Sequence, residues 1–159
     1  MIGRWAGLFG GLILAWAPLA ALGASELSAA TDLRAEAEQA ARAGGPLIVL
    51  YSRDDCKFCK TVKRDYLQAL AADPKFARRV VIREISQDRA TPLSDFAGRP
   101  TTHAALATRE KIKLVPVVAF YGPGGRQLAE PIVGARLPDF YPAYLEDAVE
   151  QSVRALKKP

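Results

Sequence analysis

The sequence predicts an α/β fold in which helices flank a central mixed sheet of about four strands. Two observations lead to this prediction. Helix-like segments alternate with short apolar runs along most of the chain, and such alternation is typical of parallel strand pairing. The last two strand-like runs are joined by the tight turn GPGG at 122–125, which requires antiparallel pairing. The expected order is α-β-α-β-α-β-β-α, and the first helix in this order is an extra N-terminal helix before the first strand.

The first half of the domain supplies two helices and two strands. Helical spacing of apolar residues begins after Thr31, the expected N-cap, and ends at Gly44. The continuous apolar run LIVLY is typical of a strand buried on both faces. The expected elements are a helix over 31–43, a strand over 47–51, a helix over 56–72 and a strand over 80–85.

The second half begins with a long connection, residues 86–101, that contains Pro92, Gly98 and Pro100. It exceeds the ~2–6 residues usual for such loops, and it is either a substrate-facing insertion or a solvated connector. Pro131 favours an edge position for the last strand. The further expected elements are a helix over 102–112, strands over 115–121 and 126–134, and a final helix from about 138.

The N-terminus has the layout of a secretory signal peptide. Arg4 precedes an apolar run that glycines interrupt, and the small-residue stretch AALGAS follows. We expect residues 1–24 to be the signal peptide and 25–159 to form a single domain of about 135 residues. An uncleaved N-terminal anchor helix is the alternative. Either way, we expect the protein in the periplasm.

The charge pattern argues against a nucleic-acid partner. The chain has 22 Lys and Arg, 17 Asp and Glu, and a formal net charge of +5. Basic and acidic residues interleave and form no basic stripe, so a solvated surface is the expected reading.

Both cysteines of the chain, Cys56 and Cys59, lie in the stretch YSRDDCKFCKTV. A disulfide across a two-residue gap closes almost no loop, so it would stabilise the fold very little as a cross-link. A structural zinc site usually has four Cys or His ligands, whereas the chain has two cysteines and one histidine, His103, in another expected element. The remaining interpretation is a redox pair that opens and closes, which the strand-then-helix setting favours.

The expected helix start gives the two thiols different roles. Cys56 falls in the first turn, where unpaired N–H groups and the positive end of the helix dipole stabilise a thiolate, and Lys57 adds positive charge. Cys59 lies one turn deeper, so we expect it to be less exposed. Cys56 would then attack a substrate disulfide, and Cys59 would resolve the mixed disulfide. Either Asp54 or Asp55 would cap the helix.

At this point the chain resembles the thioredoxin superfamily. The resemblance rests on LIVLYSRDDCKFCK at 47–60 and KLVPVVAFYGPGGRQLAEPIVG at 113–134, and it spans about 31–156. It is closest to exported SoxW/SoxS-like thioredoxin-like proteins, which share the leading helix, the aromatic third position of CxxC (Phe58 here) and an insertion before the third helix.

The resemblance implies roles for particular residues. Cys56 would be the nucleophile, Cys59 the resolving thiol, and Pro116 would follow a cis peptide bond that faces them. The implied substrate groove consists of Val115, Pro116, Lys57 and Phe58. No cofactor is implied, and no metal site.

Some positions depart from the family pattern. Leu50 stands where cytosolic thioredoxins carry a buried acid, so the proton transfer assigned to that acid needs water or Glu84 on the neighbouring strand. A plain surface charge is the favoured reading of Glu84. Asp55 replaces the usual Trp before the first cysteine. His103 is expected to be a solvated surface residue without a role.

The expected function is that of a thiol–disulfide oxidoreductase that reduces a disulfide-bearing partner protein through Cys56-Lys57-Phe58-Cys59. Electrons would come from a membrane or periplasmic thiol donor, and the protein is expected to be a monomer. Two alternatives stay open: a Dsb-type oxidase or isomerase, and a binding module that holds a partner peptide or Cu(I) between the two thiolates.

Overall fold

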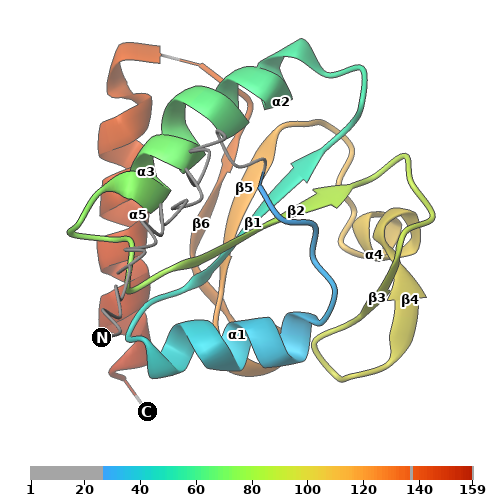
Figure 1. Ribbon diagram of the computed structural model, residues 1–159, viewed down its shortest axis with the longest axis horizontal. Helices are drawn as coiled ribbons and strands as arrows, with labels where there is room; N and C mark the ends of the chain where they lie inside the picture. The colour runs from blue at the N-terminus through green and yellow to red at the C-terminus, as the bar shows by residue number, and fades with distance from the viewer. Residues whose placement is uncertain (1–26, 137, 159) are drawn as a thin grey trace, which may run out of the picture.

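The computed structural model describes residues 27–136 and 138–158 of the chain. Its centre is a four-stranded sheet in the order β2-β1-β5-β6 (Figure 1). β1 and β2 are parallel, whereas β5 runs antiparallel to both of its neighbours, β1 and β6. The sheet strands are β1 (Leu47–Ser52), β2 (Val81–Ser86), β5 (Val117–Tyr121) and β6 (Gln127–Val133). The predicted mixed sheet is confirmed, and β6, which contains Pro131, is an edge strand as expected.

Helices cover both faces of this sheet. One face packs against the extra N-terminal helix α1 (Leu33–Arg42) and α4 (His103–Arg109). The other face packs against α5 (Tyr141–Leu156) and against a continuous helical stretch. That stretch consists of α2 (Lys57–Thr61), a π-helical segment (Val62–Leu67) and α3 (Gln68–Ala72). The predicted α/β architecture is confirmed, with one core on each side of the sheet.

Alternation along the strands decides which core each side chain joins. Ile48 and Leu50 of β1 pack toward α5, while Val49 and Tyr51 pack toward α1. Every residue of β1 is buried, which confirms the expectation of a strand covered on both faces. Because β1 is a central, fully buried strand, it fixes the position at which the following CxxC segment begins.

The helix boundaries differ from the sequence predictions in two places. Asp32, not Thr31, caps α1, because its carboxylate accepts the Ala35 N–H at 2.9 Å. The Thr31 N–H and hydroxyl instead contact the Glu36 carboxylate at 3.4 Å. The helix expected over 56–72 is present, but its middle turn is π-helical, a form that is often found at functional sites.

The long connection before α4 is not a plain loop. It contains a short antiparallel hairpin, β3 (Pro92–Ser94) and β4 (Pro100–Thr102). The buried Asp95 carboxylate accepts the backbone N–H groups of Ala97 and Arg99, both at 2.9 Å, and pairs with Arg99 and Arg109. The Asp95 carboxylate thus anchors the hairpin together with Leu93 and Phe96, which pack into the apolar core. The apolar pattern of the sequence carries no sign of the carboxylate contacts.

The predicted signal peptide, residues 1–24, lies outside the described residues. Within the residues that are described, no helix combines the length and the apolar character needed to cross a membrane.

Candidate redox site

The two cysteines form a disulfide at the start of α2. Their Cα atoms are 5.2 Å apart, and Cys56 is the N-cap of the helix. The Cys59 N–H donates to the Cys56 sulfur at 3.1 Å. The prediction that an aspartate caps this helix is therefore wrong. The Cys56 sulfur itself accepts a backbone N–H of the first turn, as an N-cap side chain does.

The two sulfurs differ in access. Cys56 is partly exposed, whereas Cys59 is 2 % exposed. Between them, Lys57 is exposed and Phe58 is 65 % exposed. An incoming disulfide therefore meets Cys56 and the Phe58 ring, while Cys59 stays behind the first turn of the helix.

Ion pairs hold the segment that joins β1 to Cys56. Arg53 pairs with Asp55 at 2.8 Å, and Asp54 pairs with Arg89 at 2.7 Å. The Asp54 N–H also donates to the Asp88 carboxylate at 3.1 Å. Asp54 thus ties the CxxC segment to the connection after β2, where Asp88 and Arg89 lie, whereas Asp55 pairs within its own segment. Sequence reasoning missed Arg89, because the pairing joins segments 35 residues apart.

The Val115–Pro116 peptide bond is cis and leads into β5. Val117 is the register partner of Tyr51 near the end of β1, so Pro116 lies at the edge of the sheet from which the CxxC segment departs. The Pro116 carbonyl accepts the Gly134 N–H at 2.8 Å. Among the described residues, no backbone hydrogen bond involves the N–H or the carbonyl of Val115.

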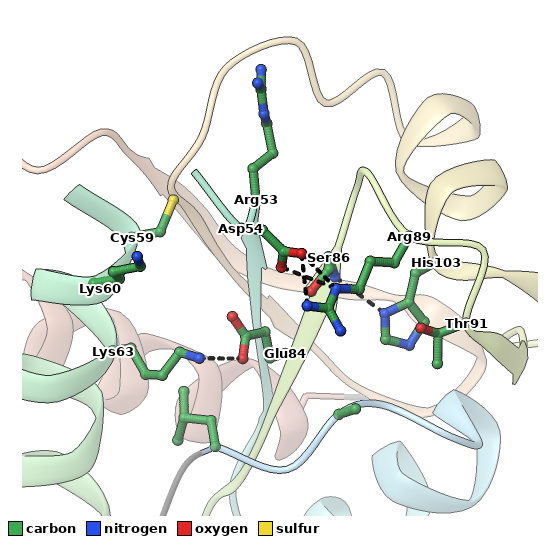
Figure 2. Close-up of a pocket in the computed structure, with 12 residues that line it drawn as sticks. Arg53, Asp54, Cys59, Lys60, Lys63, Glu84, Ser86, Arg89, Thr91 and His103 are labelled. Atoms are coloured by element: carbon green, nitrogen blue, oxygen red, sulfur yellow. Dashed lines mark hydrogen bonds and ion pairs between the residues drawn. The ribbon is translucent and has the colours of Figure 1, made fainter. Parts of the chain in front are cut away.

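A cavity of about 380 Å³ opens behind Cys59, between α2 and the end of β2 (Figure 2). Glu84 of β2 and Lys63 of the π-helical segment face each other across it, with their charged atoms 2.6 Å apart. The Ser52 hydroxyl donates to the same Glu84 carboxylate at 2.7 Å. Side-chain exposure is 15 % for Glu84 and 21 % for Lys63, so the reading of Glu84 as a plain surface charge is wrong.

The register of the sheet explains how Glu84 reaches this cavity. Leu50, which stands in place of the acid that thioredoxins bury, is the direct register partner of Glu84 on the neighbouring strand. Glu84 therefore faces the same side of the sheet as Leu50, one strand further out. Arg83 faces the opposite side and pairs with the buried Glu36 of α1 at 2.8 Å.

His103 is not a solvated surface residue, because it is 2 % exposed at the other end of the cavity. Its Nδ1 accepts the Ser86 N–H at 3.1 Å, and its Nε2 donates to the Ala30 carbonyl at 2.9 Å. The ring thus joins the end of β2 to the chain before α1, which is a structural role. Over residues 27–136 and 138–158, no three His, Cys, Asp or Glu side chains gather in a group that could hold a metal ion.

Comparison with known proteins agrees with this geometry. The sequence pattern of the thioredoxin-like domain matches residues 33–148. No curated protein has a sequence that matches the chain.

Solved structures show the same fold at low sequence identity. A thioredoxin-fold protein from Helicobacter pylori aligns with a TM-score of 0.61 at 11 % identity, over 84 % of this chain and 83 % of that one. The thioredoxin of Malassezia sympodialis aligns with a TM-score of 0.51 at 13 % identity, over 80 % of this chain and 94 % of that one. At these identities the similarity concerns the fold alone.

Proposed function

The chain belongs to the thioredoxin-like family, and from this premise we propose that it is an exported thiol–disulfide oxidoreductase that reduces disulfides in partner proteins. One observation carries the proposal. A disulfide closes over two residues at a helix start, with one sulfur partly exposed and the other 2 % exposed. Such a pair contributes little as a staple, whereas the unequal access suits a two-step exchange.

The exchange begins with the reduced protein. The Cys56 thiolate attacks one sulfur of the substrate disulfide, that S–S bond breaks, and the leaving thiolate takes a proton. Cys59 then attacks the Cys56 sulfur of the mixed disulfide, which releases the second substrate thiol. Two electrons pass to the substrate, and the protein returns to the disulfide form of the structure.

The helix start prepares Cys56 for the first step. The Cys59 N–H that points at the Cys56 sulfur at 3.1 Å would donate to the thiolate in the reduced protein. The positive end of the helix dipole and the nearby Lys57 act in the same direction. The nucleophile therefore ionises at the surface, where substrates arrive.

The groove beside Cys56 is the proposed substrate site. The N–H and carbonyl of Val115 have no backbone partner among the described residues, so they are free to pair with an extended substrate segment as a sheet edge does. Pro116, Lys57 and Phe58 would frame that segment. Backbone pairing would hold the substrate disulfide next to Cys56 without demanding a particular sequence.

Glu84 is the proposed proton acceptor for Cys59. A buried thiol must lose its proton before it can attack the mixed disulfide, and Glu84 lines the same cavity as Cys59. The other carboxylate of this lining, Asp54, is exposed and paired with Arg89. Lys63 and Ser52 hold the carboxylate in place. A water molecule in the cavity would carry the proton between the two groups.

The remaining parts of the proposal rest on the sequence. The N-terminal pattern supports export to the periplasm, where a membrane-bound or periplasmic thiol donor would return the electrons. The closer resemblance to SoxW/SoxS-like proteins would make a carrier protein of sulfur oxidation the partner. The exchange itself requires no cofactor, and we propose that a monomer carries it out.

The test combines turnover with trapping. The purified protein should reduce insulin with a thiol as electron source, and Cys59→Ala should accumulate mixed disulfides that Cys56→Ala does not form. Resolution within one molecule has a high effective concentration, so removing Cys59 prolongs the intermediate. Folded variants without turnover or adducts would favour the binding module, and a strongly oxidising potential would favour the Dsb-type oxidase.

A further inference from the structure

Most of the exposed large apolar side chains in the described part of the chain lie near the redox site or at the same edge of the sheet. Five large apolar residues of the described chain are more than half exposed. Two adjoin the site in sequence, namely Phe58 between the cysteines and Leu114 before the Val115–Pro116 bond. Val133 and Phe140 come from elsewhere in the chain. The fifth, Tyr144, lies one turn along α5 from Phe140.

Topology brings the first four to one edge of the molecule. β1 ends at this edge, β5 begins there, and β6, antiparallel to β5, ends there with Val133 as the register partner of Val117. α5 starts after the short turn that follows β6. The upper edge of Figure 1 shows the starts of α2 and α5, the segment that leads into β5 and the end of β6. We call the exposed side chains Phe58, Leu114, Val133 and Phe140 the redox rim.

The charges that flank the redox rim are mostly positive and unpaired. Lys57 and Lys60 lie on α2, Lys113 precedes Leu114, and Arg136 lies just before α5. All four are exposed, and within the described residues none makes an ion pair.

The other cations near the CxxC segment are neutralised. Arg53 pairs with Asp55, and Arg89 pairs with Asp54. Among the described residues, two exposed carboxylates near the rim make no ion pair: Asp139, in the turn just before α5, and Asp88, which accepts the Asp54 N–H. Four cations without an ion pair against these two carboxylates leave a net positive charge around the apolar rim.

We infer that the redox rim selects a partner segment that is apolar around its cysteine and acidic on its flanks. This inference rests on the proposed function and specifies its substrate class. The disulfide requires that the occupant carry sulfur, and Phe58 and Leu114 provide apolar contact beside it. The free lysines and Arg136 would attract carboxylates, which raises the rate of encounter with acidic segments and lowers it with basic ones.

The test compares two fluorogenic peptide disulfides that share an apolar core around the cysteine. Aspartates flank the core in one peptide and lysines in the other. The wild-type kcat/KM should favour the acidic peptide by about tenfold at low salt, and the preference should fall to about twofold near 0.5 M NaCl, because salt screens surface charges. The double variant Lys113→Glu, Arg136→Glu should abolish or invert the preference.

A control reverses a single charge away from the redox rim. Arg78→Glu alters an exposed arginine in the turn after α3 and should keep the preference. Leu114→Ser should raise KM for both peptides alike.

Insulin turnover distinguishes a failure of the inferred substrate preference from a failure of the proposed redox function. If insulin is reduced but both peptides react equally, or if Arg78→Glu abolishes the preference as strongly as the double variant, the inference is wrong while the redox function stands. If neither insulin nor either peptide is reduced, the proposed function fails as well.

Discussion

Replacing Glu84 by Gln removes a charge from the cavity behind Cys59 and changes little else. Gln has the same size, and its amide oxygen can still accept the Ser52 hydroxyl, which lies 2.7 Å from the carboxylate. Lys63 loses its partner at 2.6 Å. Breaking a buried ion pair costs about 3–5 kcal/mol and an exposed pair contributes about 0–1 kcal/mol. Since the Lys63 side chain is 21 % exposed and can turn toward water, we expect a loss of about 1–2 kcal/mol and a folded variant.

The rate of the second exchange step should fall more than the stability does. A positioned general base contributes about 10²–10⁴-fold to a rate. The cavity has about 380 Å³, whereas a water molecule occupies about 30 Å³ of liquid, so water can partly replace the base. We therefore expect release of the second substrate thiol to slow by about ten- to hundredfold near pH 6.

A second effect of Glu84→Gln opposes the first. Without the carboxylate, the Cys59 thiolate meets less negative charge and forms more easily once hydroxide is abundant. The two pH profiles should therefore converge or cross as pH rises above neutrality. A single-turnover measurement from a fluorescent mixed disulfide on Cys56 would follow this step directly.

The control is Glu130→Gln, which removes an exposed carboxylate on β6, away from the cavity that Cys59 lines. It should leave the profile unchanged. A Glu84→Gln profile that runs parallel to the wild type at every pH would show that Glu84 only positions its neighbours. An unchanged rate near pH 6 would refute the proton route altogether.

Three other predictions follow from the described contacts. Alkylation of the reduced protein should label Cys56 before the other cysteine, and peptide mapping with the opposite order would reverse the assignment. Asp95→Asn should lower Tm at pH 7; the Arg99 amide holds the pKa of Asp95 at about 2, below the usual 3.8, so the deficit against wild type should vanish as pH falls from about 4 to 2. Tyr51→Phe should cost about 1–2 kcal/mol in urea unfolding, because the hydroxyl of Tyr121, 3.0 Å away, loses its buried partner.

Much of the fold was readable because its signals are local. Apolar runs marked the strands, Gly44 and the GPGG turn marked boundaries, and Pro131 marked an edge strand. The cysteine spacing after a buried strand pointed to the redox site for the same reason. In each of these cases a few adjacent residues carry the physical cause.

The hairpin and His103 were not readable because their causes are distant. Each hairpin strand has three residues and begins with a proline, so the pattern looks like a loop until the Asp95 hydrogen bonds are known. His103 is buried because the Ser86 N–H and the Ala30 carbonyl satisfy both ring nitrogens. A sequence without its fold cannot reveal such partners.

Glu84 lies on the strand next to the position of Leu50, and the two positions differ in what a carboxylate would cost there. A carboxylate at the position of Leu50 would lie in the central strand β1, where the side chain is fully buried, and its desolvation would cost much stability. At Glu84 the carboxylate lies on the edge strand, 15 % exposed, with a hydroxyl donor and an ammonium group beside it. Because both positions face the same side of the sheet, an acid on β2 can serve Cys59 at a lower cost in stability than one on β1. Lys63 of the π-helical segment belongs to the same arrangement, since its ammonium group lies 2.6 Å from the Glu84 carboxylate and holds it in place.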